Sequence, residues 1–125
     1  MAVALFASAC GGDAEAPGVG PSTAKGGTTF EVSLGDNLFE PGQFTVAPGD
    51  AVVFNLTNDG AAVHNKRVAG PDGQYDTVDD AVSEPCILAA GGAGVLEWVA
   101  PEERGTYLFR CDFHPTDMIG TIVVQ

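Results

Sequence analysis

The chain has 125 residues, 45% of them hydrophobic and 18% charged, so it has room for one ordinary domain with an apolar core. This length excludes a multidomain oxidase, a barrel enzyme and a dinucleotide-binding enzyme of normal size. Seventeen acidic residues against five Lys and Arg give a formal charge of −12, which argues against nucleic-acid binding and favours a basic protein partner.

The first residues are typical of an export signal. A short apolar run followed by small residues leads to Cys10, and residues 1–10 resemble the end of a bacterial lipoprotein signal. That resemblance implies a lipidated Cys10 as the mature N-terminus, and the alternative is a cleaved secretory signal with an incidental cysteine. Both interpretations place the domain outside the cytoplasm, in the periplasm or at the cell surface. Residues 11–27 have the composition of a flexible linker, so the folded domain is expected over 28–125.

From Thr28 onward, hydrophobic and polar residues alternate in short runs that end at turn signals such as Asn58-Asp59-Gly60. The side chains expected in the core are Phe30, Val32, Leu34, Phe44, Val46, Val52, Phe54, Leu56, Leu96, Trp98, Tyr107, Phe109, Cys111, Ile122 and Val124. These short strands, with 17 Gly and 8 Pro, predict an all-β, antiparallel Greek-key sandwich.

One acidic segment, residues 70–85, interrupts the alternation. We expect a solvated loop. The alternatives are one helical turn that Thr77 and Asp80 would cap, and a cluster of carboxylates around Ca²⁺. Cys86 follows this segment. It is interpreted as a buried, inert thiol, with a bridge to Cys10 as the alternative.

Near the C-terminus, Cys111, His114 and Met118 are spaced Cys-x₂-His-x₃-Met between two predicted strands. A loop anchored at both ends can turn all three side chains toward one point. Thiolate, imidazole and thioether form a soft donor set that favours copper over Mg²⁺ or Ca²⁺. A trigonal site needs a second imidazole, and His64 is the one other histidine in the sequence. Each residue alone is more often a core or surface residue, but together they predict copper ligation.

These residues resemble the cupredoxins, the blue (type 1) copper proteins of the plastocyanin and halocyanin kind. The resemblance covers residues 28–125. The segments that carry it are Phe39-x-Pro41, Ala47-Pro48-Gly49-Asp50, His64-Asn65, Gly105-Thr106-Tyr107 and the loop from Cys111 to Met118.

The resemblance implies one mononuclear copper ion. His64, Cys111 and His114 would be its equatorial ligands, and Met118 would be the weak axial ligand. It also implies that Asn65 ties the His64 segment to the ligand loop and helps to position the Cys111 sulfur.

The implied function is a one-electron carrier and not an enzyme, because four protein ligands leave no open position for a substrate. In the family, the imidazole edge at the position of His114 is the electron port, and Pro115 beside it fits that surface role. The expected partners are redox proteins such as a cytochrome or an oxidase with a basic docking face. A lipidated Cys10 would add a membrane tether.

Three alternative functions are compatible with the sequence. A copper storage, delivery or sensing module usually has more Met or His than the two of each found here. A fragment of a copper nitrite reductase or multicopper oxidase would need further histidines for a second copper site. A metal-free interaction domain would keep the sandwich and leave these side chains without a metal.

Overall fold

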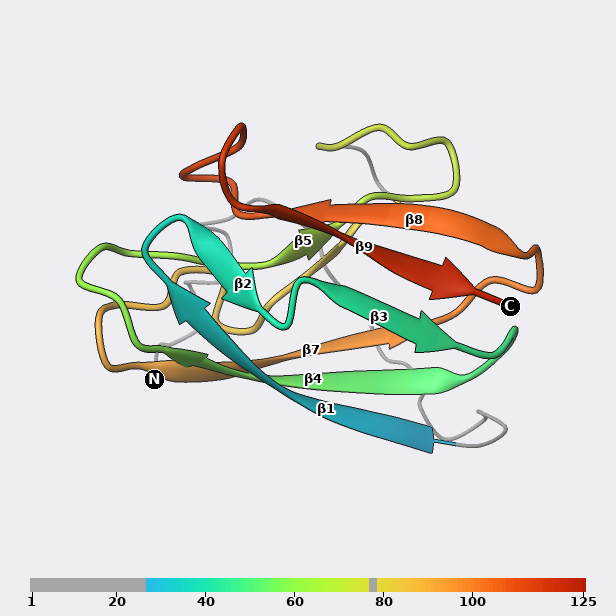
Figure 1. The fold of residues 1–125 in the computed structure, drawn as a ribbon, viewed down its shortest axis with the longest axis horizontal. Helices are drawn as coiled ribbons and strands as arrows, with labels where there is room; N and C mark the ends of the chain where they lie inside the picture. The colour runs from blue at the N-terminus through green and yellow to red at the C-terminus, as the bar shows by residue number, and fades with distance from the viewer. Residues whose placement is uncertain (1–26, 77–78) are drawn as a thin grey trace, which may run out of the picture.

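The computed structural model describes residues 27–76 and 79–125, which contain nine strands and no helix (Figure 1). The strands are β1 (Gly27–Gly35), β2 (Leu38–Glu40), β3 (Gln43–Val46), β4 (Ala51–Asn58), β5 (Arg67–Val68), β6 (Ala81–Val82), β7 (Ala93–Val99), β8 (Gly105–Arg110) and β9 (Ile119–Val124). None of the described residues belongs to a helix long and apolar enough to cross a membrane. The expected signal over 1–10 and nearly all of the expected linker lie outside the described residues.

The strands form two sheets that pack face to face. One sheet has the order β2-β1-β4-β7 and the other has the order β3-β9-β8-β5-β6 (Figure 1). The predicted all-β sandwich is confirmed, but the sheets are mixed, because β1 pairs with β4 and β3 pairs with β9 in parallel. Between β1 and β4 the chain leaves the first sheet after β2, adds β3 to the second sheet and returns as β4.

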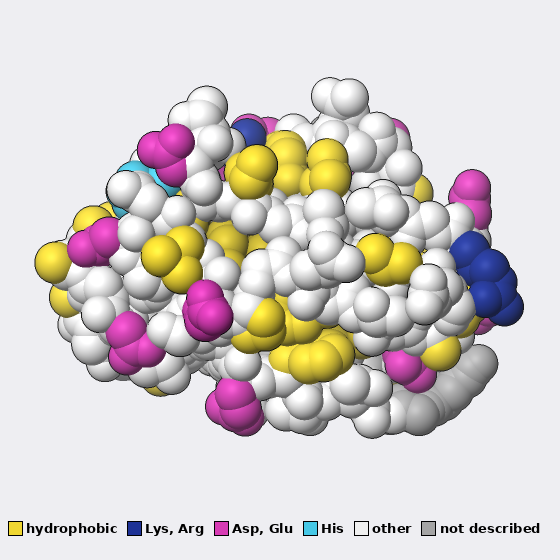
Figure 2. Space-filling model, viewed as in Figure 1, with side chains coloured by type: hydrophobic (Ala, Val, Ile, Leu, Met, Phe, Trp, Pro, Cys, Tyr) yellow, Lys and Arg dark blue, Asp and Glu magenta, His cyan; other side chains and the backbone are white. Residues whose placement is uncertain are grey.

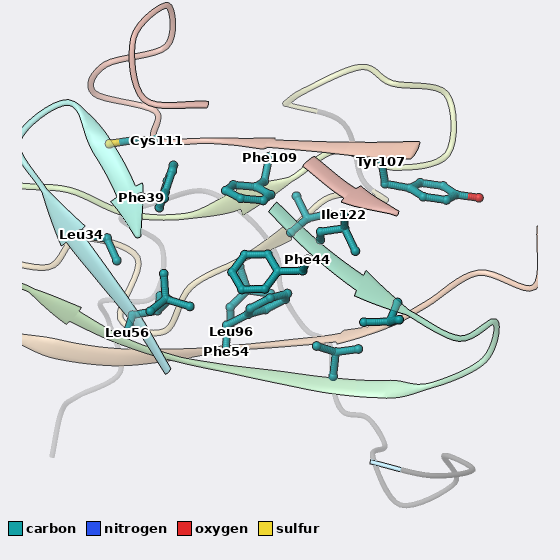
Figure 3. Packing of buried hydrophobic residues seen from close by; sticks show 14 of the residues in the cluster. Leu34, Phe39, Phe44, Phe54, Leu56, Leu96, Tyr107, Phe109, Cys111 and Ile122 are labelled. Carbon is teal, nitrogen blue, oxygen red and sulfur yellow. The ribbon is translucent and has the colours of Figure 1, made fainter. Parts of the chain in front are cut away.

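The core lies between the sheets and contains the predicted alternating residues. Phe30 and Trp98 are partly buried at its margin, and the other predicted side chains are buried. Aromatic rings fill the centre: the centroid of Phe109 lies 4.9 Å from that of Phe39 and 5.9 Å from that of Phe44. Figure 3 shows Cys111 at one end of this cluster and Tyr107 at the other. The core therefore anchors β8 up to the residue where the ligand loop begins.

Three short strands were not expected from the sequence, because two or three residues are too few for an alternation to show. They are β2, β5 and β6. The strand β6 lies in the acidic segment, where we expected a solvated loop. That expectation is wrong for Asp80, whose side chain is 2% exposed and lies 3.3 Å from Arg67. Thr77, the candidate helix cap, lies outside the described residues.

Candidate metal centre

The loop between β8 and β9 carries three of the four predicted ligands, and its backbone is closed by hydrogen bonds. The amide of Cys111 donates to the carbonyl of Met118 at 3.0 Å, so the two ends of the loop are tied together. Inside the loop, the amide of His114 donates to Cys111 and that of Met118 donates to His114. These hydrogen bonds make the loop a compact turn that keeps Cys111, His114 and Met118 close together.

The fourth predicted ligand comes from the segment between β4 and β5. The amide of His64 donates to Leu88 at 3.1 Å, and its carbonyl accepts from the Leu88 amide at 2.9 Å. The preceding turn is held by Asn58, a fully buried residue whose Nδ2 donates to the carbonyls of Ala62 and Leu88, at 2.9 Å in each case. Backbone pairing and a buried amide thus fix the position of His64.

Three side chains converge at one end of the sandwich. The ligand atoms of His64, Cys111 and His114 all lie within 4.8 Å of one another, the one such group found among the described residues. Sγ of Cys111 is 3.8 Å from Nδ1 of His64 and 3.6 Å from Nδ1 of His114. An ion with bonds of about 2.0 Å to nitrogen and 2.3 Å to sulfur, spread at 120°, would hold N and S about 3.7 Å apart. The residues therefore fit a trigonal metal ion.

The cluster is shielded from water. His64, Cys111 and Met118 have no exposed surface, and His114 is partly exposed. Met118 belongs to the core cluster and is joined to His114 and Cys111 through the loop backbone. Two imidazoles, a thiolate and a nearby thioether form the donor set typical of copper sites that transfer electrons.

The residue after Cys111 links the two ligand-bearing segments. The amide of Asp112 donates to Oδ1 of Asn65 at 2.8 Å, and Nδ2 of Asn65 donates to the Asp112 carboxylate at 3.0 Å. Asn65 therefore bridges the His64 segment to the ligand loop. The part of Asp112 in this link could not be inferred from the sequence, because an acidic residue in a loop is usually solvated.

Two arginines surround Asp112 and connect it to the acidic segment. Nε of Arg67 lies 2.8 Å from the Asp112 carboxylate, and Nε of Arg110 lies 3.1 Å from it. Burial raises the pKa of Asp112, but hydrogen bonds from Asn65 and Arg67 outweigh burial and leave it below its ordinary value. Arg110 also pairs with Asp76 at 3.3 Å. Among the described acidic residues, none forms a group suited to a cation, so the calcium alternative finds no support there.

The outer nitrogen of His64 contacts a carboxylate in the turn between β1 and β2. Nε2 of His64 lies 3.0 Å from Oδ1 of Asp36. Hydrogen bonds from the amides of Ala61 and Ala62, together with that of His64, lower the pKa of Asp36 to about 2. Asp36 is therefore a carboxylate at neutral pH. No pattern in the sequence marked it, because the turn and His64 are far apart in the chain.

Lys66, two positions after His64, is unexpectedly buried. Lys66 has no exposed surface, and its Nζ has no hydrogen-bond partner among the described residues. Its Nζ instead lies among aromatic rings, 2.9 Å from the ring centroid of Phe109 and 4.4 Å from that of Phe54. Burial lowers the pKa of Lys66 well below its ordinary value.

Cys86 does not belong to the metal cluster. It is half-buried and disulfide-bonded, so its interpretation as an inert free thiol is wrong. Cys111 is a free thiol among the described cysteines. The bridge to Cys10 considered above involves a residue outside the described part of the chain.

The surface around the metal centre carries both hydrophobic and acidic side chains (Figure 2). Phe113 is 42% exposed, and Pro115 is exposed on the other side of His114. Figure 2 shows histidine atoms at the surface near the end where Figure 1 places the β8–β9 loop, with carboxylates and hydrophobic side chains around them. This is the face through which the cluster meets solvent.

Comparison with known proteins relates this geometry to a family. A family model described as a cupredoxin-like domain matches residues 1–124. A plastocyanin of Rumex obtusifolius is 35% identical over 104 residues, which cover 77% of this chain and 100% of the relative.

Solved structures share the fold. Auracyanin A, a "blue" copper protein of Chloroflexus aurantiacus, superposes with a TM-score of 0.65 at 23% identity. The match covers 79% of this chain and 99% of the auracyanin chain. A copper-containing nitrite reductase of Thermus scotoductus also matches, with a TM-score of 0.55 at 15% identity, over 79% of this chain and 28% of the enzyme. The fold therefore occurs in a small copper protein and in part of an enzyme.

Proposed function

Because the chain belongs to the cupredoxin-like family, we propose that it is a type 1 copper protein that carries single electrons between redox proteins. The observation that carries the proposal is the convergence of His64, Cys111 and His114, whose ligand atoms lie within 4.8 Å of one another. Met118 would supply the weak axial donor. Bound at this donor set, copper supplies a reversible one-electron couple.

The frame around the centre suits electron transfer because it resists rearrangement. Cys111 extends from β8, whose side chains Tyr107 and Phe109 are packed in the core. His64 is held through both its backbone groups, and the loop from Cys111 to Met118 is closed on itself. Side chains fixed in this way need to move little when the charge at the centre changes by one electron, which keeps the reorganisation energy low.

The centre is closed to substrates, which supports a carrier and not an enzyme. Three of the four candidate ligands have no exposed surface, and four protein ligands would leave a bound copper ion no open position for a substrate. His114 is the partly exposed member, so electrons would enter and leave through its imidazole edge. The exposed side chains of Phe113 and Pro115 would form the contact surface around this port.

The partner is expected to be a redox protein with a basic docking face, such as a cytochrome or an oxidase. The formal charge of −12 supports this expectation, because opposite charges steer association. A position outside the cytoplasm, which the export-like residues 1–10 predict, would fit redox partners of this class. The membrane tether through Cys10 stays a prediction, which the intact mass of the exported protein tests. A lipid on Cys10 would support it, and a disulfide at Cys10 would contradict it.

The visible spectrum of the Cu(II)-loaded protein tests the proposal. We expect an intense thiolate-to-copper band that Cys111→Ser abolishes. The matched control is Met118→Leu, which should keep the band and raise the reduction potential, because the axial donor tunes the metal without holding it. A wild-type protein without the band would contradict the proposal. Rapid loss of Cu(I) to a competing chelator would indicate copper delivery in place of electron transfer.

A further inference from the structure

The two ring nitrogens of His64 face different partners. Nδ1 points to the metal cluster and lies 3.8 Å from Sγ of Cys111, and Nε2 lies 3.0 Å from Oδ1 of Asp36. The imidazole is fully buried, whereas the Asp36 side chain is 49% exposed. A half-exposed carboxylate therefore contacts the outer nitrogen of the buried histidine.

The position of Asp36 is fixed by the surrounding backbone. Its Oδ1 accepts hydrogen bonds from the amides of Ala61 and Ala62, at 3.0 and 3.1 Å, and its Oδ2 accepts a second one from Ala61 at 3.1 Å. These amides belong to the segment that leads into His64. Asp36 thus joins the turn between β1 and β2 to the histidine-bearing segment.

A glycine makes room for this contact. A Cβ atom added at Gly60 would collide with the Asp36 carboxylate, and it would also lie 2.9 Å from the Asp36 amide nitrogen. The carboxylate is half-exposed, but its position between its own turn and residues 60–62 is fixed on the side that faces His64.

We propose that Asp36 is a positioning residue that holds His64 in the Nε2–H tautomer and lowers the reduction potential of the copper bound at Nδ1. A carboxylate accepts hydrogen bonds and cannot donate one, so Nε2 must carry the proton and Nδ1 keeps its lone pair for the metal. The negative charge makes the imidazole a stronger donor. A stronger donor stabilises Cu(II) more than Cu(I). This inference rests on the proposed copper site.

The substitution Asp36→Asn tests the effect of the charge. The amide oxygen can still accept the hydrogen bonds, so the fold and the blue band should persist. We expect the ratio of Cu(II) to Cu(I) affinities to fall about tenfold, which corresponds to a potential about 59 mV higher for one electron. The matched control is Asp59→Asn, which removes an equal charge from an exposed residue bonded to Ser33, and it should leave the potential nearly unchanged. Equal shifts in the two variants would overturn the proposal.

The tautomer is tested separately in the metal-free protein by ¹⁵N NMR of the histidine rings. Wild type should show His64 protonated at Nε2 alone, and Asp36→Ala should show a mixture of the two tautomers. A pure Nε2–H form in Asp36→Ala would contradict the positioning role. If the copper-loaded wild type lacked the blue band, the proposed function would fail, and this measurement would still decide what Asp36 does to His64.

Discussion

At the scale of single residues, Lys66 is the largest departure from the usual chemistry of a core. Its side-chain nitrogen, Nζ, has no hydrogen-bond partner among the described residues. It lies instead near the rings of Phe39, Phe44, Phe54 and Phe109. Cation–π attraction of about 2 kcal/mol would offset only part of the cost of burying the charged form, and burial accordingly lowers the pKa of Lys66 well below its ordinary value. Lys66 is therefore a source of instability next to the metal centre.

We expect Lys66→Met to stabilise the metal-free protein by about 1–3 kcal/mol, because Met has a similar length and no polar group to bury. The pH dependence follows from the lowered pKa. The unfolded chain binds a proton at Lys66 that the folded protein releases, so stability rises with pH from the folded pKa up to 10.5. Urea unfolding at several pH values measures both effects. A variant that is less stable than wild type, or that keeps the same slope, would contradict this account.

The sequence and its family resemblance predicted the candidate ligands and the linking Asn65, but not the contacts of Asp36 and Asp112 or the burial of Lys66. Cys111, His114 and Met118 are recognisable because donor type and spacing lie within one loop. Asp36 meets His64 only because the turn after β1 lies against the segment after β4. A contact between such distant residues leaves no periodic signal, and a lysine is by default assigned to the surface.

At the scale of elements, ion pairs attach the acidic segment to the metal-bearing loop. Arg67 begins β5, is 9% exposed, and contacts Asp80 and Asp112 at 3.3 and 2.8 Å. Arg110 ends β8 and contacts Asp112 from the other side. The network joins β5, β8 and the segment before β6 around the residue that follows Cys111.

We expect Arg67→Met to destabilise the protein by about 3 kcal/mol, because it removes a buried cation that contacts both Asp80 and Asp112. Hydrogen exchange in β5 and β6 should become faster as well. Arg104→Met, at an exposed position, is the matched control and should change stability by less than about 0.5 kcal/mol. Chemical unfolding of both variants provides the comparison, and equal effects would rule out a structural role for the network.

The strand pattern was easier to predict than the topology. Alternation in β4 and β9 identified the buried faces of both strands. Alternation says which face is buried but not which strand is the neighbour, so the parallel pairs β1–β4 and β3–β9 were not foreseen. The strand β5 was missed because its two buried residues include an arginine.

At the scale of the whole molecule, the charge of −12 determines which partners can approach quickly. We expect electron transfer to a basic cytochrome to slow by about tenfold or more between 10 and 200 mM salt, because screening weakens steering. Transfer to an acidic cytochrome should be slow at low salt and become faster. Stopped-flow kinetics measure both rates. A rate with the basic partner that did not depend on salt would contradict electrostatic docking.

The central claim is that one copper ion is held by two imidazoles and one thiolate at the end of the sandwich. X-ray absorption of the copper-loaded protein tests it most directly, because it counts the neighbours of the metal by element. We predict a short coordination shell of one sulfur and two imidazole nitrogens, and Cys111→Ser should remove the sulfur. A shell of nitrogen and oxygen alone in the wild-type protein would contradict the account.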